Sequence, residues 1–362
     1  MVARWERPPP HKHSNTTTRG PLPNTKSMKK LLHILLIAAL FASCHQDEPI
    51  NPTPEESPIQ FGDVQTRAAV SDIQDNGFGV WAFISNSLQT NFTLMDNVKV
   101  QYNEGAWKYS PVVYWIDDTR FSFVATYPYD AAGTDFKFDS ENTVITLGVS
   151  ETPSEVDYLM ATHEANTGDE NFDFSAPVPL QFQHMLSNVS LNIWRDGAKH
   201  QNDQMRIRKV TLSNIRKGGT YSSSTKTWTP TNDKLNLSYE TSDDMVSDSD
   251  NIGAVIVKDD GTLEAGGSTP SKPFSDMLLI PQTLDASNSI SLKIQYELKR
   301  NNAASWEKAE LETVLPNITW EAGRRYTYNI VLSSVTDITI YYIQTKVDPW
   351  GTPQVGGTVI IK

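Results

Sequence analysis

The chain has 362 residues, of which 38% are hydrophobic and 20% are charged, and it carries a formal net charge of −12. This length is sufficient for about two domains, each with a core of its own. The acidic balance argues against a nucleic-acid-binding protein, which needs a basic surface. No stretch reaches the roughly 18 apolar residues of a membrane-spanning helix.

The amino-terminal residues are predicted to be a leader and a signal peptide. Residues 1–27 lack apolar periodicity and are interpreted as a disordered leader or a start-site artefact. A signal peptide is predicted over residues 28–43, because a basic start and the apolar run Leu31–Ala42 precede small residues and Cys44. Phe41-Ala42-Ser43-Cys44 resembles the lipobox of bacterial lipoproteins, whose cysteine is acylated, with Phe41 where leucine is more usual. The alternative is a free thiol behind an ordinary secretory signal.

Residues 44–58 are predicted to be a flexible tether, because they are polar and rich in proline. Cys44 is the only cysteine, so no intrachain disulfide can form and stability must come from packing. The first 43 residues hold seven of the 31 basic and one of the 43 acidic side chains, which leaves residues 44–362 with 24 basic and 42 acidic ones. Such a surface favours solubility outside the cell.

The stretch Gln60–Ala69 is predicted to be a first β-strand that ends in Thr66-Arg67-Ala68. A trypsin-like protease cuts after arginine, and the small and polar residues on either side of Arg67 favour its access. Cleavage of the bond between Arg67 and Ala68 would remove this strand from the fold. The alternative is that Arg67 is an ordinary solvated loop residue.

From Ile59 onward the sequence consists of short β-like runs separated by turn residues, with almost no helical periodicity. One short helical turn is expected within Pro153–Thr162. Leu180–His184 and Met185–Ile193 are expected to form one strand. The other predicted strands are Phe78–Ile84, Val98–Tyr102, Phe121–Tyr127, Val144–Leu147, Arg206–Leu212, Ala254–Val257, Asp276–Ile280, Ile290–Leu298, Arg325–Leu332, Ile338–Ile343 and Gly357–Lys362.

This spacing of strands predicts an all-β protein with two tandem β-sandwich domains. We place the boundary near residue 180, because turn-rich loops there give way to a new run of strands. The predicted domains are therefore residues 59–180 and 181–362.

No group of residues indicates an enzyme, a metal site or a cofactor. The sequence contains neither a Gly-x-Ser-x-Gly elbow nor an HExxH helix. His163, His184 and His200 lack the spacing of metal ligands. The acidic loop Asp248–Asp259 weakly resembles an EF-hand calcium loop, and a solvated turn is the interpretation that we prefer.

The nine tryptophans leave room for a carbohydrate-binding face. Trp107, Trp228 and Trp306 stand in polar, turn-rich contexts and are the best candidates for exposed rings that stack on sugars. The alternative for each of them is a hairpin residue that caps a sandwich.

Several phrases, taken in order, resemble the fimbrillin-like family, the type V pilins of Bacteroidales. They are Ile59-Gln60-Phe61 with Thr66-Arg67-Ala68, Phe78-Gly79-Val80-Trp81-Ala82-Phe83, Phe182-Gln183-His184-Met185-Leu186-Ser187-Asn188-Val189, Leu278-Leu279-Ile280-Pro281-Gln282-Thr283-Leu284, Trp320-Glu321-Ala322-Gly323-Arg324-Arg325-Tyr326-Thr327-Tyr328-Asn329-Ile330 and Val347-Asp348-Pro349-Trp350. The acidic residues just after Cys44 resemble the surface-export signals of lipoproteins from the same bacteria.

The resemblance implies transthyretin-like sandwiches, delivery to the outer membrane as a lipoprotein, and maturation by an arginine-specific protease. Cleavage after Arg67 would discard the lipid and the first strand, and a strand from another pilin subunit would fill the groove. The donor is expected at the carboxyl end, with Ile338, Ile340 and Tyr342 in one candidate strand and Val359 and Ile361 in the other. Alternatively, both of these strands complete their own sandwich.

Two hypotheses of function follow. The first is a structural or adhesive fimbrial subunit that is anchored through lipid on Cys44, matured at Arg67 and then incorporated into the fimbrium. The second is a permanently lipid-anchored surface protein that binds glycans or ligands on host or bacterial surfaces, with Arg67 uncut.

Overall fold

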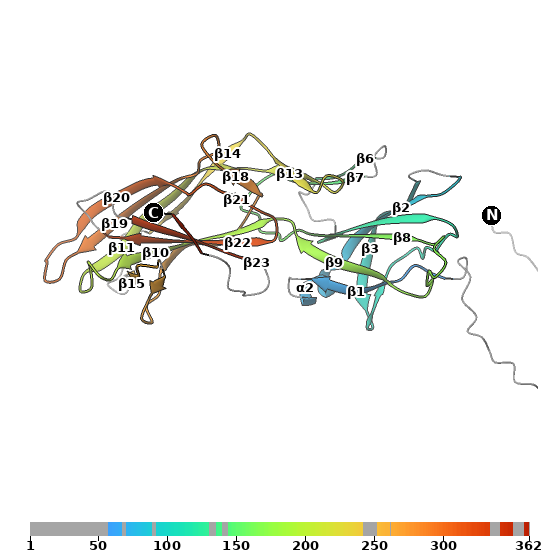
Figure 1. Cartoon of the computed structure of the whole chain (residues 1–362), viewed down its shortest axis with the longest axis horizontal. Coiled ribbons are helices and arrows are strands. Elements are labelled where there is room, and N and C mark those ends of the chain that lie inside the picture. Colours follow the sequence, from blue (N-terminus) through green and yellow to red (C-terminus); the bar gives the residue numbers. More distant parts are fainter. Residues whose placement is uncertain are drawn as a thin grey trace, which may run out of the picture. The chain divides into compact units, whose positions relative to one another are not determined.

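Short β-strands make up almost all of the regular structure, as the aromatic and β-branched runs predicted. The computed structural model describes residues 57–66, 70–88, 92–129, 135–139, 144–241, 252–260, 262–333, 341–349 and 358–361. All of these residues belong to one compact unit, Pro52–Lys362. The leader, the signal peptide and Cys44 lie outside the described residues, as do Arg67 and Ala68. The predicted all-β fold is confirmed (Figure 1).

The amino-terminal strands form one seven-stranded sheet. In spatial order its strands are β1 (Phe61–Thr66), β9 (Val178–His184), β8 (Leu159–Asn166), β5 (Arg120–Tyr127), β2 (Phe78–Ser85), β3 (Phe92–Asn103) and β4 (Ala106–Lys108). The edge strands β1 and β4 contact each other, so the sheet curls around a core of its own. Phe78, Phe121 and Phe123 lie in this core, which is closed by Ile73 of the helix α2 (Val70–Asn76).

Two further sheets pack face to face as a sandwich. The first consists of β16 (Leu263–Glu264), β15 (Ala254–Val257), β10 (Ser187–Asp196), β22 (Arg324–Leu332), β23 (Tyr341–Pro349) and β24 (Thr358–Ile361), with β17 (Ser271–Leu279) also paired to β10. The second consists of β14 (Lys234–Glu240), β11 (Gln204–Arg216), β19 (Ser291–Lys299) and β20 (Glu307–Val314). Alternate side chains of β10 and β22 meet those of β11 and β19 in one large buried cluster.

Two smaller sheets complete the described structure. The first is four-stranded, in the order β13 (Thr227–Pro230), β12 (Gly219–Ser222), β7 (Val144–Val149) and β6 (Asp135–Asp139). The second pairs β18 (Gln282–Leu284) with β21 (Ile318–Trp320). β6 and β7 precede residue 180 in the sequence, whereas β12 and β13 follow it, so this sheet contains strands from both predicted domains. The domain boundary near residue 180 stays a prediction.

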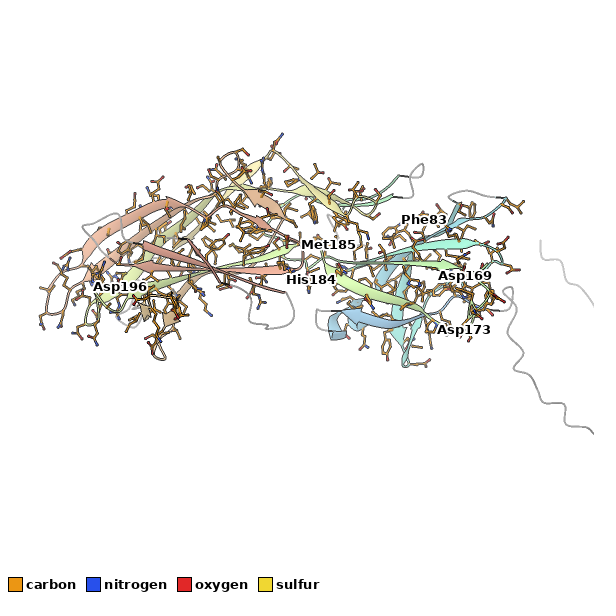
Figure 2. The ribbon with its side chains drawn as sticks, viewed as in Figure 1. Phe83, Asp169, Asp173, His184, Met185 and Asp196 are labelled. Carbon is orange, nitrogen blue, oxygen red and sulfur yellow. The ribbon has the colours of Figure 1, made fainter. Side chains whose placement is uncertain are left out.

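The chain changes from the seven-stranded sheet to the sandwich between β9 and β10. The expected single strand over Leu180–Ile193 is therefore wrong, because β9 ends at His184 and β10 begins at Ser187. The N–H of Met185, between the two strands, donates to the carbonyl of Tyr158 at 2.8 Å, one step beyond the last residue pair of β8 and β9. From Ser187 onward the chain pairs with β17 instead. His184 and Met185 are labelled at this point in Figure 2. Met185 and Leu186 are buried there.

Two expectations about helices are also corrected. The helical turn expected within Pro153–Thr162 is absent, because β8 already begins at Leu159. The helix α2 was not expected, since it is only seven residues long. It ends at Asn76. The next residue, Gly77, has a φ of 74° that suits glycine, and its N–H donates to the Ile73 carbonyl at 2.8 Å.

Candidate functional site: the first strand and its neighbours

The first strand lies between two partners that come from distant parts of the sequence. On one side β1 pairs in parallel with β9, from Phe61 opposite Val178 to Thr66 opposite Phe182. Just before β1, Pro58 forms an antiparallel bridge with Tyr114. The segment from residue 57 to residue 66 is therefore held along its length by other parts of the chain.

The backbone at the start of this segment makes hydrogen bonds in both directions. The Ile59 N–H donates to the Val113 carbonyl at 2.8 Å, and the Tyr109 hydroxyl donates to the Ile59 carbonyl at 2.7 Å. On the other side the Val178 N–H donates to the Gln60 carbonyl at 2.7 Å. Removal of the segment would leave all of these partner groups without their present contacts.

The side chains of the first strand fill the core as well as the ladder. Ile59 is 1% exposed and Phe61 is 4% exposed. The ring of Phe61 lies 5.5 Å from that of Tyr109, 6.1 Å from that of Phe123 and 6.3 Å from that of Phe78, in each case edge to face. Burial of each of these two side chains contributes about 1.5–3 kcal/mol, so the strand is part of the core and not an appendage.

At Gly62 the first strand passes so close to Pro177 that there is no room for a side chain. A β-carbon at this position would lie 2.7 Å from Cβ and 2.8 Å from Cγ of Pro177. The ring of Pro177 cannot swing aside as a flexible side chain does, so a strand that follows this path needs glycine here. A strand that took the same place would therefore need an apolar residue, an aromatic residue and a glycine at the positions of Ile59, Phe61 and Gly62.

The predicted cleavage point follows the strand directly. β1 ends at Thr66 and α2 begins at Val70, so the bond between Arg67 and Ala68 falls in the link that joins the two elements. Because β1 is an edge strand of its sheet, no other strand of that sheet would have to leave with it.

The carboxyl-terminal candidates are strands of the sandwich in this structure. Tyr342 lies in β23 opposite Val331 of β22, whereas Ile338 and Ile340 lie outside the described residues. Val359 and Ile361 lie in β24, which among the described strands pairs with β23 alone, at the edge of its sheet. The last strand is thus held through four residue pairs on one side.

The three tryptophans singled out from the sequence lie in separate places. Trp107 on β4 packs against Phe78 with ring centroids 4.9 Å apart. The guanidinium carbon of Arg206 lies over the ring of Trp306, 4.0 Å from the centroid of that ring. Trp228 on β13 faces Tyr221 of β12 at 5.7 Å. All three are half-buried. They lie in or against three different sheets of the described structure, which therefore does not join them into a single sugar-binding face.

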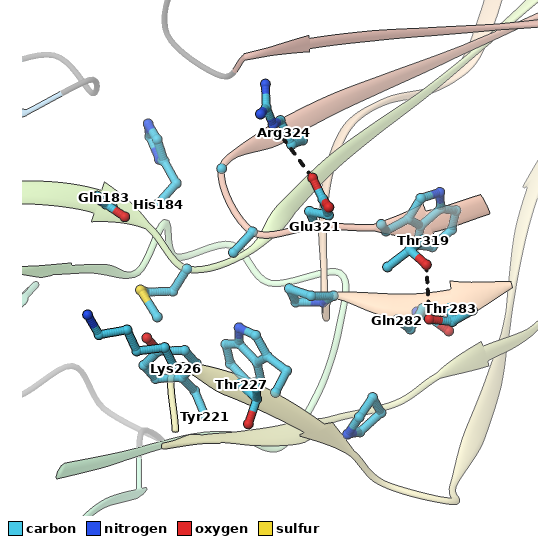
Figure 3. A pocket seen from close by; sticks show the side chains of 17 residues that line it. Gln183, His184, Tyr221, Lys226, Thr227, Gln282, Thr283, Thr319, Glu321 and Arg324 are labelled. Carbon is cyan, nitrogen blue, oxygen red and sulfur yellow. Dashed lines mark hydrogen bonds and ion pairs between the residues drawn. The ribbon is translucent and has the colours of Figure 1, made fainter. Parts of the chain in front are cut away.

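Trp228 differs from the other two because it lines a cavity of about 670 Å³. The cavity lies between the hairpin of β12 and β13 on one side and residues 319–324 on the other (Figure 3). The indole N–H of Trp228 is buried and has no hydrogen-bond partner within the described part of the chain. The sequence indicated Trp228 but not the cavity, because the opposite wall of the cavity comes from residues about ninety positions further on.

Two of the three histidines His163, His184 and His200 are buried beside carboxylates. His184 is buried where the chain changes sheets, with Nδ1 2.9 Å from a carboxylate oxygen of Asp157. His200 is also buried, and its Nδ1 lies 2.9 Å from Asp203 Oδ2. Within the described ranges, no three His, Cys, Asp or Glu side chains come together as a metal site would require, and no helix is long and apolar enough to cross a membrane.

One solved structure supports this architecture. A crystal structure of a fimbrial protein from Bacteroides vulgatus is similar at 17% sequence identity with a TM-score of 0.58, over 81% of this chain and 99% of that one. A candidate cell adhesion protein from Bacteroides uniformis is similar at 15% identity with a TM-score of 0.42, over 83% of this chain and 99% of that one. No curated protein matches the sequence.

The first of these similarities concerns the fold alone, since its sequence identity is low. The family assignment comes from the sequence, because the model of the fimbrillin-like family matches residues 66–350. That range begins at the last residue of β1 and extends past the end of β23. The chain therefore belongs to the fimbrillin-like family.

Proposed function

We propose that this protein is a fimbrial subunit that is exported as an outer-membrane lipoprotein through Cys44, matured by an arginine-specific protease between Arg67 and Ala68, and assembled by exchange of a β-strand. The observation that carries the proposal is the place of β1 at the edge of its sheet, directly before Arg67. Family membership supports the wider statement that the protein is a fimbrial or adhesive subunit.

Removal of the first strand would create an acceptor groove with defined chemistry. Its floor would be the apolar surface around Phe78 and Phe123, now covered by Phe61. Its walls would be β9 and the segment around Val113, with backbone groups that now bond to residues 57–60. A groove of this kind is costly in water, and a strand from another subunit satisfies both the pockets and the backbone groups.

The carboxyl-terminal strands are the proposed donors. Among the described strands, β24 is paired with β23 alone, so it can leave the sheet without disturbing another of them. The candidate residues remain Ile338, Ile340 and Tyr342 in the first segment, and Val359 and Ile361 in the second. In the alternative, β23 and β24 keep the pairing of this structure and the donor comes from a different pilin subunit.

The test is limited proteolysis of the purified uncut protein with an arginine-specific protease. We expect one stable fragment that begins at Ala68, followed by the formation of oligomers detectable by light scattering and electron microscopy. The Arg67→Ala variant should stay intact and monomeric. Arg120→Ala removes an exposed arginine from the start of β5 and is the matched control, which should be cut and assemble like the parent.

Two results would contradict the proposal. The first is the absence of a cut near Arg67 under conditions that preserve the fold. The second is a fragment that begins at Ala68 and yet stays monomeric. A ligand-binding role is possible whether or not the chain is cut after Arg67. The cavity beside Trp228 is the observation that favours such a role.

A further inference from the structure

The cavity beside Trp228 has the size and the composition of a ligand site. Its volume of about 670 Å³ lies within the range of roughly 300–1,000 Å³ that is usual for small-molecule pockets. Aromatic, amide and hydroxyl side chains line it together with Lys226, Glu321 and Arg324. Figure 3 shows Lys226 and Tyr221 on one side, and Glu321 and Arg324 on the other.

The wall formed by residues 319–324 is held firmly in place. The Tyr326 hydroxyl donates to the Thr319 carbonyl at 2.9 Å and accepts from the Glu321 N–H at 2.8 Å. The Ser187 hydroxyl donates to the Glu321 carbonyl at 2.9 Å, and the Gly323 N–H donates to the Leu186 carbonyl at 2.9 Å. A wall that is already ordered loses little conformational entropy when a ligand binds.

The opposite wall offers a flat apolar ring and polar groups around it. Tyr221 and Trp228 are direct cross-strand neighbours on β12 and β13. Burial raises the pKa of Tyr221 above its ordinary value, so its hydroxyl keeps its proton at neutral pH and can donate a hydrogen bond. The indole N–H of Trp228 is buried and has no acceptor among the described residues, so Trp228 contributes its ring, and not this N–H, to the lining of the cavity.

The charged groups around the cavity favour a negatively charged ligand. Lys226 and Arg324 outnumber the single carboxylate of Glu321, in a chain whose net charge is −12. Glu321 and Arg324 approach to 3.7 Å, and their side chains are 64% and 45% exposed. An exposed ion pair of this kind is weak, so a ligand carboxylate can replace Glu321 as the partner of Arg324.

We propose that this cavity binds an acidic sugar residue, with the pyranose ring on Trp228 and the carboxylate between Lys226 and Arg324. An indole face suits the apolar face of a pyranose, and the surrounding amides and hydroxyls suit its hydroxyl groups. No residue of β1, β23 or β24 lines the cavity. Arg324 begins β22, which pairs with β23, so the site is tested on the uncut protein, in which all of these strands are in place.

The test compares methyl β-D-glucuronide with methyl β-D-glucoside, which differ only in the carboxylate. Binding to the uncut protein is followed by calorimetry and by the indole N–H resonance of Trp228, which the Trp228→Phe variant identifies. We expect the glucuronide to shift this resonance and to bind at least about tenfold more tightly than the glucoside, as a hydrogen bond to a charged group provides.

Variants of the two cations separate charge recognition from general stability. Lys226→Asn keeps a residue that tolerates the φ of 55° at this turn, and Arg324→Gln removes the second charge. Each should abolish the preference for the glucuronide while the melting temperature is unchanged. Lys217→Asn changes an exposed lysine outside the cavity and should have no effect on the preference.

Equal binding of the two sugars would overturn the proposed role of the cations. A Trp228 resonance that responds to neither sugar would overturn the proposed site. Loss of the preference in Lys217→Asn to the same extent as in Lys226→Asn would show that overall charge, and not this cavity, selects the ligand.

Discussion

The substitution Phe61→Ala measures how much the first strand contributes to the uncut protein. Phe61 is 4% exposed and meets three aromatic rings at 5.5–6.3 Å. One of those rings, Tyr109, is fixed by its hydrogen bond to the Ile59 carbonyl, which limits collapse of the cavity. We therefore expect a loss of about 3–5 kcal/mol in the free energy of unfolding, the range for truncation of a buried phenylalanine.

Thermal and denaturant unfolding of the uncut protein would measure this loss. Phe92→Ala is the matched control, because Phe92 is 47% exposed at the start of β3 and its truncation should change stability by no more than about 0.5 kcal/mol. The same measurement on protein cut at Arg67 shows whether the severed strand leaves or stays bound. If the strand leaves, products from the parent and from Phe61→Ala have identical sequences and unfold identically.

Two outcomes would contradict an integral first strand that leaves after cleavage. If Phe61→Ala costs no more than Phe92→Ala in the uncut protein, the strand is not an integral part of the core. If the two cut products unfold differently, the severed strand stays bound in its place, and the acceptor groove does not open on cleavage.

Three further predictions concern the rest of the fold. Glu297→Gln should cost about 1.5–3 kcal/mol in unfolding experiments, because Glu297 is only 7% exposed and accepts from Arg206 at 2.7 Å. Tyr328→Phe should cost about 1–3 kcal/mol, because the buried indole N–H of Trp320 donates to the Tyr328 hydroxyl at 2.9 Å and would lose its acceptor. Burial lowers the pKa of His163 from its ordinary value of 6.5. The contribution of His163 to stability is therefore full above pH 6.5 and is lost as the pH falls through the lowered pKa. In thermal melts, the His163→Gln variant should lose less stability than the parent between about pH 7 and pH 5.

Local alternation was enough to predict most of the strands. Phe121–Tyr127 was predicted from alternating aromatic residues, and β5 begins one residue earlier. The same strand shows where the pattern falls short, because Val124 on its other face is also buried. That face packs in a second cluster with Trp81 and Met160, a long-range contact that the spacing within one strand does not reveal.

Other features depend on tertiary contacts or on weak signals. The apolar residues Val70 and Ile73, followed by Gly77, are the signal that could have predicted α2. The unbroken run of β-like residues over 180–193 hid the change of sheet, because β17 and β22, the new partners of the chain, lie far away in the sequence.

The candidate site could be predicted only in part. Phe61 and the arginine that follows the strand were visible in the sequence, since aromatic residues and a basic residue stand out among polar neighbours. The parallel partner β9, the closing segment around Val113 and the contact of Gly62 with Pro177 were not visible. Each of them joins residues that lie more than fifty positions apart.

Cleavage at Arg67 is tested on the fibres themselves by the amino-terminal residue of the protein recovered from fibres shed by cells that produce it. The proposal predicts Ala68, with the lipid and the first strand absent. Recovery of chains that still begin at Cys44, with Arg67 intact, would contradict maturation by cleavage, and would leave a permanently anchored surface protein as the account of this chain.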